Sequence, residues 1–313
     1  MQIKSKLYYL LIFCGWITFG CQTEFIPANI NTNAEYVVEG YIEYGDNALP
    51  PYVILTKSRP FFKSLSIEEL NTLFIKNAII TINDGNTSST LNQVCFGDVP
   101  IGSRQQFADL LGVPLDSLKT NICVYADLFG KIKVLPNKNY DLTIRVDNDV
   151  ITASTMIPPY VPLDSIWVRE APGKPSDTLV QLYSSIHDPA GVKNFYRYQC
   201  GINSDNFITP FNSVYDDPLI DGIQFDFRLI RPKQKGEDFD QKTFGLFTIG
   251  DSVAIKWSTI DEAHFNFWNT YEFNKGNQGP FSSYTTINTN IHGGLGVWGG
   301  YNSRVYRLKV KRK

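Results

Sequence analysis

The amino-acid sequence predicts a mainly β protein, with an N-terminal β-sandwich of immunoglobulin or transthyretin type and a second β-rich domain that carries one amphipathic helix. The 313-residue chain has 17 Tyr, 21 Phe and 17 Pro but only 2 Met, a composition that favours strands and turns. Many short segments alternate apolar and polar residues with a period of two, which indicates strands with one buried face. Clusters of Gly, Asp, Asn and Pro separate these segments, as turns do.

The first twenty residues have the pattern of a secretory signal peptide. Lys4 and Lys6 precede an apolar run over residues 7–19, which is too short to span a bilayer because a helical span needs about 20 residues. The run ends at Gly20-Cys21, a pair that resembles a bacterial lipobox, so we expect cleavage before Cys21 and lipidation of its thiol. The alternative is an unmodified cysteine at the end of an ordinary leader.

Lipidation of Cys21 would attach acyl chains such as palmitate, and each buried methylene contributes about 0.8 kcal/mol to membrane binding. Gln22 follows in place of the Asp that retains lipoproteins in the inner membrane, so the expected location is the outer membrane. Residues 21–33 would form a polar tether. The sequence leaves open whether the protein faces the periplasm or the cell surface.

Residues 34–158 are predicted to form the sandwich domain. Alternation over residues 35–45 indicates a strand, which pairs with a second strand over residues 51–62 across a Pro-containing turn. A hairpin over residues 133–158 ends the domain, and its first strand would bury alternate side chains, those of Tyr140, Leu142, Ile144 and Val146. Strands of this length and spacing are typical of an immunoglobulin-like or transthyretin-like sandwich.

Two helical segments interrupt this β pattern. Capping-box spacing at Ser66 and Glu69 predicts that one of them begins there. The other, over residues 102–113, lies between Cys95 and Cys123 and is expected to be an excursion from the sandwich.

Three cysteines remain after the leader and Cys21. Cys95 and Cys123 could form a disulfide in an oxidising cell envelope, closing the helical excursion at its base. Cys200 would then be unpaired. No His lies near Cys200 in the sequence, which favours a buried strand thiol over a nucleophile.

The second domain is predicted over residues 159–313, after a proline-rich joint at Pro158-Pro159. Short aromatic strands divided by Asp, Gly and Pro fill most of it. Thr259 and Glu262 have capping-box spacing at the start of its long helix, whose apolar face would contain Ala263, Phe267, Trp268 and Tyr271.

The segment "GGLGVWGG", residues 293–300, is predicted to be a tight glycine-rich loop. Trp298 has two interpretations, a side chain buried in the second core, which we favour, or an anchor that contacts a partner. The candidate partner-contact residues are Trp298, Gly293, Gly294, Gly299 and Gly300. A phosphate-binding loop is excluded, because no Lys-Ser/Thr follows the glycines and no helix is expected after them.

No residue pattern predicts catalysis, a metal or a cofactor. His187, His264 and His292 stand apart in the sequence, and the acidic residues of "DDPLIDG" are better explained by a polar turn than by calcium ligands. The chain contains no G-x-S-x-G elbow. A net charge of −2 with a pI near 6.0 gives no general attraction for nucleic acid.

Eight blocks of sequence occur in the order typical of one group of proteins. They include "YVVEGYI", "KNAIITINDG", "YDLTIRVDNDVITASTMIP", "HDPAGVKNFYRY" and the closing "NIHGGLGVWGGY". On these blocks, which span nearly the whole mature chain, the sequence resembles the DUF4249 family of Bacteroidota envelope lipoproteins, a domain of unknown function. The resemblance implies an envelope lipoprotein, often encoded beside TonB-dependent outer-membrane receptors, and it supplies no catalytic residues.

We therefore expect a non-enzymatic lipoprotein, anchored in the outer membrane, that acts as an accessory or binding subunit for a neighbouring barrel of the TonB-dependent receptor type, or for the cargo of that barrel. The main alternative is a module that captures glycans or peptides on its aromatic strands. A hydrolase is the weaker alternative, because it would need carboxylates that converge in a cleft.

Overall fold

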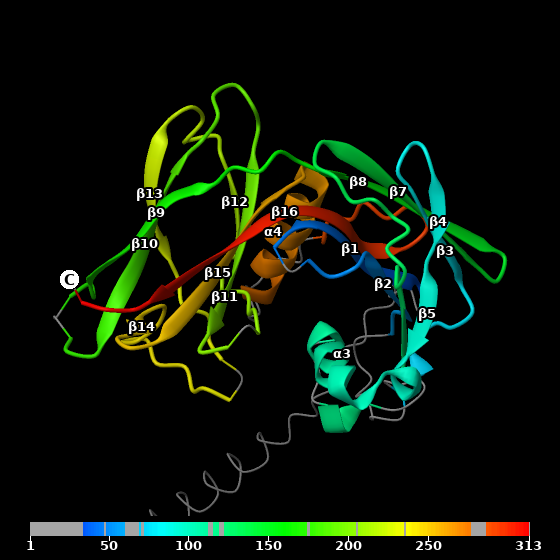
Figure 1. The fold of residues 1–313 in the computed structure, drawn as a ribbon, viewed down its shortest axis with the longest axis horizontal. Helices are drawn as coiled ribbons and strands as arrows, with labels where there is room; N and C mark the ends of the chain where they lie inside the picture. The colour runs from blue at the N-terminus through cyan, green and yellow to red at the C-terminus, as the bar shows by residue number, and fades with distance from the viewer. Residues whose placement is uncertain are drawn as a thin grey trace, which may run out of the picture. The chain divides into compact units, whose positions relative to one another are not determined.

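A computed structural model gives the fold of residues 34–46, 48–59, 69, 72–111, 115–118, 122–173, 176–204, 206–234, 236–276 and 286–312 (Figure 1). The predicted leader, Cys21, the tether and the start of the helix predicted from Ser66 lie outside these described residues. The described chain is mainly β, as the sequence predicts. No helix within the described ranges is long and apolar enough to cross a membrane.

The largest sheet has eight strands and takes them from both halves of the chain. Its members are β1 (Tyr36–Gly45), β2 (Tyr52–Lys57), β5 (Asn92–Cys95), β6 (Cys123–Ala126), β11 (Phe195–Ile202), β12 (Val214–Asp216), β15 (Ser252–Ile260) and β16 (Leu295–Lys309). Their order across the sheet is β12-β11-β15-β16-β1-β2-β6-β5. The first and last strands of the described chain, β1 and β16, are parallel neighbours at its centre, and the other pairs are antiparallel.

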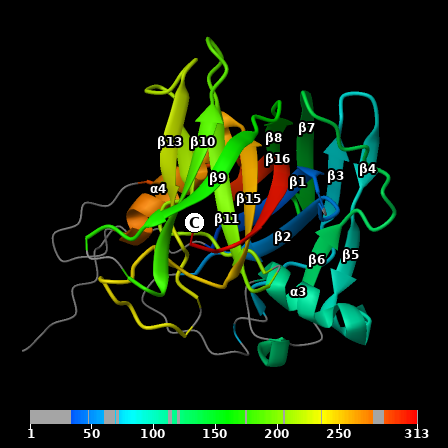
Figure 2. The same ribbon diagram turned by 60° about the vertical axis from the view of Figure 1, so that its left-hand side comes forward.

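Two four-stranded sheets accompany this large sheet. One has the order β4-β3-β7-β8, with β3 (Ile79–Asn83), β4 (Ser88–Thr90), β7 (Lys138–Val146) and β8 (Asp149–Ile157). In the other, β10 (Leu179–His187) pairs with β9 (Leu163–Glu170), β13 (Gln224–Leu229) and β14 (Phe247–Thr248). Figure 2 shows the two small sheets on either side of β16 and β1.

Both small sheets pack on the same face of the large sheet, where they enclose two hydrophobic cores. Trp298 of β16 lies in the first core with Ile144 of β7 and Ile151 of β8. Further along the same strand, Tyr306 packs on the second core, which contains Trp257 of β15. Trp298 and Tyr306 share a face of β16 because successive side chains of a strand alternate between its two sides. The arrangement is thus two sandwiches that share one sheet, which agrees with the sandwich-like fold predicted.

The predicted division at Pro158-Pro159 falls between these two cores. The second core is built from residues beyond position 159, whereas the first also takes Ile291 and Trp298 from the C-terminal part of the chain. Because strands from both predicted segments join in one sheet, residues 34–313 form a single compact unit. The two segments share backbone hydrogen bonds and do not meet only at a linker.

The helices lie on the opposite face of the large sheet. α3 (Arg104–Leu111), with short 3₁₀ turns at Phe96–Asp98, Ile101–Ser103 and Leu115–Ser117, forms the excursion predicted between the two cysteines. Phe107 of α3 packs on Ile54 of β2. The second helix, α4 (Glu262–Gly276), packs Phe265 against Val297 and Tyr301 of β16.

The start and the buried face of α4 differ from the sequence prediction. Thr259 continues β15, and its hydroxyl accepts a hydrogen bond from the Val161 N–H at 3.0 Å, so it does not cap the helix. Asp261 caps α4 instead, because its Oδ1 accepts the N–H of His264 at 2.8 Å. The buried side chains of α4 are His264 and Phe265, whereas Tyr271, predicted on the apolar face, is 39% exposed.

Strand alternation is confirmed where the sequence predicts it. In β7 the side chains of Tyr140, Leu142, Ile144 and Val146 are buried. β7 and β8 form the predicted hairpin, in register from Lys138 opposite Ile157 to Val146 opposite Asp149. Asp147 in the turn adopts a φ of 52°, a left-handed conformation that Asp tolerates better than most residues.

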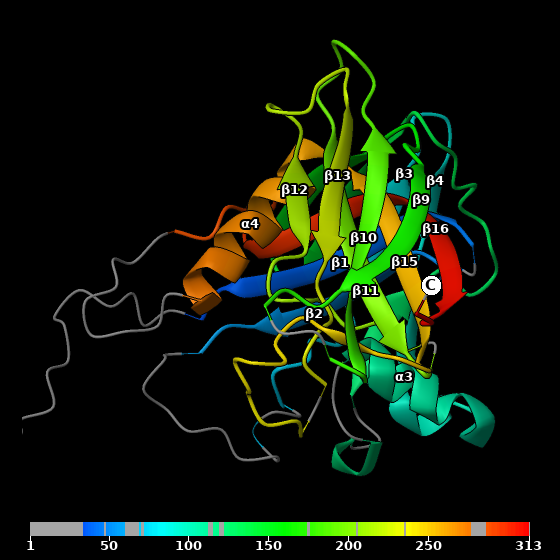
Figure 3. The same ribbon diagram turned by 90° about the vertical axis from the view of Figure 1, so that its left-hand side faces the viewer.

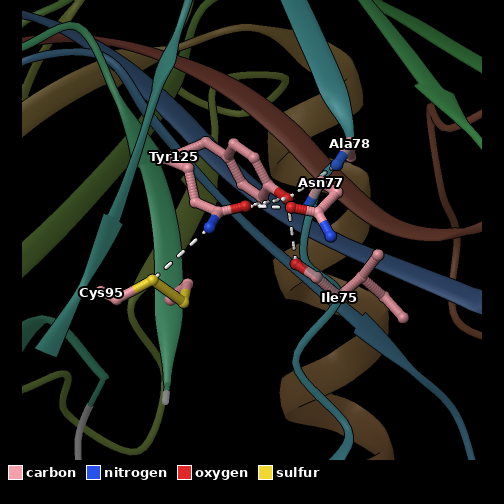
Figure 4. Close-up of a disulfide and its surroundings, with 7 residues drawn as sticks. Ile75, Asn77, Ala78, Cys95 and Tyr125 are labelled. Atoms are coloured by element: carbon pink, nitrogen blue, oxygen red, sulfur yellow. Dashed lines mark hydrogen bonds between the residues drawn. A yellow bond between two sulfur atoms is a disulfide. The ribbon is translucent and has the colours of Figure 1, made fainter. Parts of the chain in front are cut away.

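Cys95 and Cys123 are joined by a disulfide that links β5 to β6 directly across the strand pair (Figure 4). Tyr125 on β6 supports the same region, because its hydroxyl accepts the Ala78 N–H and donates to the Ile75 carbonyl, both at 3.0 Å. The side chain of Gln93 accepts the Asn77 N–H at 2.7 Å. The disulfide and these bonds hold the excursion and the chain before β3 at the end of the large sheet.

Replacing Cys95 and Cys123 together with Ala is expected to lower the free energy of unfolding by about 3–4 kcal/mol. The cysteines are 28 residues apart, and in the chain-entropy model the disulfide restricts a loop of that length in the unfolded state. Urea unfolding followed by circular dichroism measures the change. Cys200→Ala provides a thiol-removal control inside a core, and a double variant as stable as the wild type would contradict the expectation.

Candidate functional site

An apolar groove lies at the open edge of the second sandwich, between β12 of the large sheet and β13 of the small sheet. Both strands are labelled in Figure 3. It has a volume of about 340 Å³. Its apolar lining residues are Phe211, Tyr215, Phe227, Ile230 and Phe244, and its polar lining residues are Asn212 and Arg228. We call this set of residues the edge groove.

The edge groove exposes aromatic side chains that ordinarily lie inside a protein. Phe211 is 62% exposed and Phe244 is 44% exposed, and their ring centroids are 6.4 Å apart. Phe239 is 67% exposed, and its ring centroid lies 5.6 Å from that of Phe244, with the two rings tilted. Tyr215 and Phe227 form the inner end, 6.3 Å apart, and pack on the second core. Contiguous exposed aromatic surface of this kind marks interaction sites in soluble domains.

A second hollow, of about 240 Å³, continues the edge groove past Phe244 and has charged walls. Arg231 and Glu237 form its main ion pair, with 2.6 Å between Nη2 and Oε1. The hydrogen bond from Arg231 lowers the pKa of the Glu237 carboxyl to about 2. This carboxyl stays ionised at neutral pH and is therefore unsuited to act as a general acid.

The outer edge of β13 has no strand partner among the described residues, because β13 pairs only with β10. The Asp188 N–H donates to the Ile223 carbonyl at 3.2 Å, so the backbone groups of Ile223 point toward β10. Residues at alternate positions after Ile223 continue to bond with β10, so the backbone groups of Gln224, Asp226 and Arg228 point outward. Of these three residues, Arg228 lines the edge groove.

A group of buried polar side chains lies elsewhere, between α4 and the large sheet. Arg197 is 3% exposed, and its Nη1 donates to the Tyr301 hydroxyl at 2.7 Å. Its guanidinium carbon lies 3.7 Å from the ring centroid of Trp268. Glu272 of α4 accepts the Ser213 N–H at 2.8 Å. These contacts hold α4 on the sheet, and they make this cluster part of the core.

His264 is fully buried in the same region. Its Nδ1 lies 3.2 Å from the Gly300 carbonyl, whereas its Nε2 has no hydrogen-bond partner in the described part of the chain. Burial, with the nearby Arg197 charge, lowers the pKa of the imidazole to about 3. The ring is therefore neutral at physiological pH.

Acidification is expected to destabilise the protein through His264. The folded pKa is below the unfolded value of 6.5, so this contribution to the free energy of unfolding is complete above pH 6.5 and is lost as the pH falls toward about 3. Its slope can reach about 1.4 kcal/mol per pH unit. Urea unfolding of His264→Asn between pH 4 and 7 should give a flatter pH dependence than the wild type.

The matched control for this pH dependence is His187→Asn, because His187 is exposed on β10. Burial is the main cause of the raised pKa values of Asp188 and Asp261. These two carboxyls lower the free energy of unfolding as the pH rises, whereas His264 raises it. Comparison between the variants therefore isolates the effect of His264. A pH dependence that is the same for His264→Asn and the wild type would contradict the assignment.

The predicted partner role of Trp298 is wrong, because its side chain is fully buried in the first core. The sequence favours burial but places it in the second core. Residues 295–300 of the segment belong to strand β16, whereas Gly293 and Gly294 lie in the turn before the strand. Gly299 and Gly300 are buried as well, whereas Gly293 is exposed and Gly294 is half-buried, so only the last two remain candidates for partner contact.

The glycines of β16 are needed because other groups occupy the space of their side chains. A Cβ at Gly299 would lie 2.7 Å from the His264 ring, and one at Gly300 would lie 2.5 Å from the Met156 carbonyl oxygen. On the neighbouring strand, a Cβ at Gly40 would lie 2.8 Å from the Trp298 ring. The sequence pattern "GGLGVWGG" thus reflects close packing at the centre of the fold.

The remaining residues weighed in the sequence have structural surroundings. Cys200 is a buried thiol on β11, as predicted, and burial raises its pKa. Asp217 accepts the Asn194 N–H at 2.5 Å, and Asp221 accepts the Gly191 N–H at 2.7 Å, so both carboxylates hold turns. Within the described ranges, no group of three or more His, Cys, Asp or Glu side chains could hold a metal ion.

The profile of the DUF4249 family, described as a domain of unknown function, matches residues 23–307. The chain belongs to this family. Comparisons with curated proteins and with solved structures gave no match. The description of the DUF4249 family states no activity, so the function of this member has to be argued from its own site.

Sequence reasoning on this DUF4249 member missed the edge groove. Its exposed aromatics come from segments far apart in the chain, with Phe211 before β12, Phe227 on β13 and Phe244 before β14. One local signal was present. Phe239 and Phe244 stand among charged and polar residues in "GEDFDQKTFG", where the polar composition predicts a surface loop and not a core segment.

Proposed function

We propose that the protein is a non-enzymatic lipoprotein of the outer membrane that binds a neighbouring barrel of the TonB-dependent receptor type, or the cargo of that barrel. The observation that carries the binding role is the edge groove, with its exposed Phe211 and Phe244. Exposed aromatic clusters are typical of binding surfaces, since aromatic side chains bury a large area at a small cost in rotamer entropy.

Anchoring is the second part of the proposal and depends on Cys21. A lipid on Cys21 and a polar tether over residues 21–33 would confine the folded unit to the membrane surface. A confined partner is present at a high effective concentration, so even a weak interface would be occupied.

The Cys21→Ser variant is expected to move the protein from the membrane fraction to the soluble fraction, because the thiol that accepts the lipid is absent. Cell fractionation with immunoblotting measures the distribution. Mass spectrometry of the N-terminal peptide of the wild type should find acyl chains on Cys21. A bare Cys21 thiol in the wild type would contradict the anchoring proposal.

Affinity purification in mild detergent tests the binding role. The tagged wild-type chain, expressed in its own host, should bring down an outer-membrane barrel. Phe211→Ala with Phe244→Ala should reduce the recovery of that barrel, whereas Phe273→Ala, which removes a 54% exposed side chain from α4, should leave it unchanged. Absence of any barrel, or equal recovery with all variants, would contradict the proposal.

A glycan-capturing module is the second candidate function, since exposed aromatic rings can also stack on sugars. The stacked rings of Trp167 and Tyr183, with centroids 6.0 Å apart, are a further aromatic surface on the second sandwich. A glycan array probed with the soluble mature chain distinguishes the two functions. Binding to glycans that needs Trp167 or Phe244, without recovery of a barrel, would favour this candidate.

A further inference from the structure

We propose that the edge groove captures an extended peptide segment of a partner protein, which pairs as an added strand with the outer edge of β13. This inference rests on the binding role proposed above and names the chemical class of the ligand. Three independent features of the groove support a peptide: its free backbone groups, its apolar hollow and an unpaired cation.

The backbone edge of β13 is the first feature. Gln224, Asp226 and Arg228 each direct one N–H and one C=O away from β10, and no described strand pairs with them. An extended peptide presents N–H and C=O groups at the same alternate spacing, so it can continue the ladder. Addition of a strand to an open edge is a recurring mode of peptide recognition, in which backbone bonds supply affinity.

The apolar hollow is the second feature, and it lies where an added strand would place side chains. Phe225, Phe227 and Leu229 share the inner face of β13, since Leu229 is opposite the buried Leu182 and the three alternate along the strand. Every second side chain of an added strand would lie on this face, next to Phe227. A hollow of about 340 Å³ accommodates aromatic or aliphatic side chains.

The charge of Arg228 is the third feature. Arg228 is exposed and borders the groove, and it makes no ion pair or side-chain hydrogen bond with another described residue. Its neighbour Asp226 is paired with Arg169 at 3.8 Å and is not free to neutralise it. A peptide with Asp or Glu among its outward residues would supply the missing partner, and an interface charge of this kind contributes to specificity.

These features favour a peptide over a glycan. Sugar recognition needs several convergent polar side chains around the stacking rings, and in the described part of the chain Asn212 and Arg228 are the only amide or charged side chains that line the groove. The free groups here belong to the backbone and have the spacing of a strand. The expected ligand therefore alternates apolar residues with polar or acidic residues.

A peptide array tests this proposal directly. Immobilised hexapeptides that alternate Phe, Leu or Val with Asp, Thr or Ser are probed with the soluble mature chain that begins at Gln22. We expect binding to a subset with an acidic residue. In that subset, N-methylation of every second backbone nitrogen gives two series of peptides, one methylated at odd and one at even positions. One series should bind at least tenfold more weakly and the other should change little, because only one set of N–H groups faces β13.

A pair of substitutions at Asp226 tests the protein side of the ladder. Asp226→Pro removes an outward N–H without removing a hydrogen bond to β10, and Asp226→Ala removes the same carboxylate but keeps the N–H. We expect Asp226→Pro to weaken peptide binding at least tenfold and Asp226→Ala to bind as the wild type does. If Asp226→Pro fails to fold, the N-methylated peptides still decide the question on the wild-type chain.

The outcomes separate this inference from the proposed function. Three results would overturn strand addition. The two Asp226 variants could bind peptide equally well, the two sets of N-methylated peptides could be weakened equally, or the array could show no peptide that binds. Recovery of a barrel in mild detergent would in that case still support the binding role. Glycan binding that Asp226→Pro leaves intact and Phe244→Ala abolishes would also overturn the inference and assign the groove to sugars.

Discussion

Replacing Trp298 with Ala is expected to lower the free energy of unfolding by about 3–5 kcal/mol, a range typical of a large aromatic side chain removed from a core. Trp298 is fully buried against strands of the first small sheet. Its Nε1 donates a hydrogen bond to the Tyr140 carbonyl at 2.9 Å, which would lose this partner inside the core. Urea unfolding monitored by far-UV circular dichroism measures the loss.

Two further variants show whether the loss comes from burial. Trp298→Phe fills most of the space but cannot donate the hydrogen bond, so it should be intermediate. Trp167→Ala removes a half-buried indole from β9 and should cost much less. If Trp298→Ala and Trp167→Ala were equally stable, the placement of Trp298 in the core would be contradicted.

Replacing Gly296 with Ala is expected to destabilise the protein by about 4 kcal/mol, because two costs coincide at this position. Gly296 has a φ of 109°, which an L-residue with a side chain rarely adopts. An added Cβ would also lie 1.9 Å from the Val38 carbonyl oxygen on the neighbouring strand. The methyl group can fit only if β1 and β16 move apart, which disrupts their pairing.

Gly102→Ala is the matched control for this substitution. Gly102 has open space around its Cα and no left-handed φ, so Ala there should change the free energy of unfolding by less than about 1 kcal/mol. Both variants are compared by urea unfolding at neutral pH. A Gly296→Ala protein within 1 kcal/mol of the wild type, as measured against this control, would show that the β1–β16 contact is looser than described.

Local features of the fold were predictable from the sequence, and long-range features were not. The period-two pattern in β7 depends only on which side chains face one core, so it can be read along a few residues. The parallel pairing of Val38 with Gly296 joins positions more than two hundred residues apart, and no local pattern records it. For the same reason, the sequence predicts a domain boundary at Pro158-Pro159, although the largest sheet contains strands from both sides of that position.

The glycines of β16 show how a local rule leads to a wrong prediction. Glycine is normally unfavourable in a strand, so "GGLGVWGG" indicates a loop when it is considered alone. In the structure, His264, Met156 and Val38 approach this strand from α4, β8 and β1. Only the positions of these three distant segments explain why the strand lacks side chains there.

The candidate site was less predictable than the fold. The sequence directs attention to aromatic strands and to a glycine-rich segment. The edge groove forms because β12 ends the large sheet and β13 ends a small one on the same side of the second sandwich. The aromatic residues of the edge groove are visible in the sequence, but their meeting at one edge follows only from the order of the strands in the two sheets.

The adjacency of β1 and β16 also bears on when the protein can fold. Residues 37–45 pair with residues 295–303, so the middle of the large sheet is incomplete until almost the whole chain has been synthesised. The first core would remain without Trp298 until that moment. Contacts so distant along the chain slow folding. For the export across a membrane proposed above, this late closure would be an advantage, because the large sheet cannot form before β16 has been synthesised.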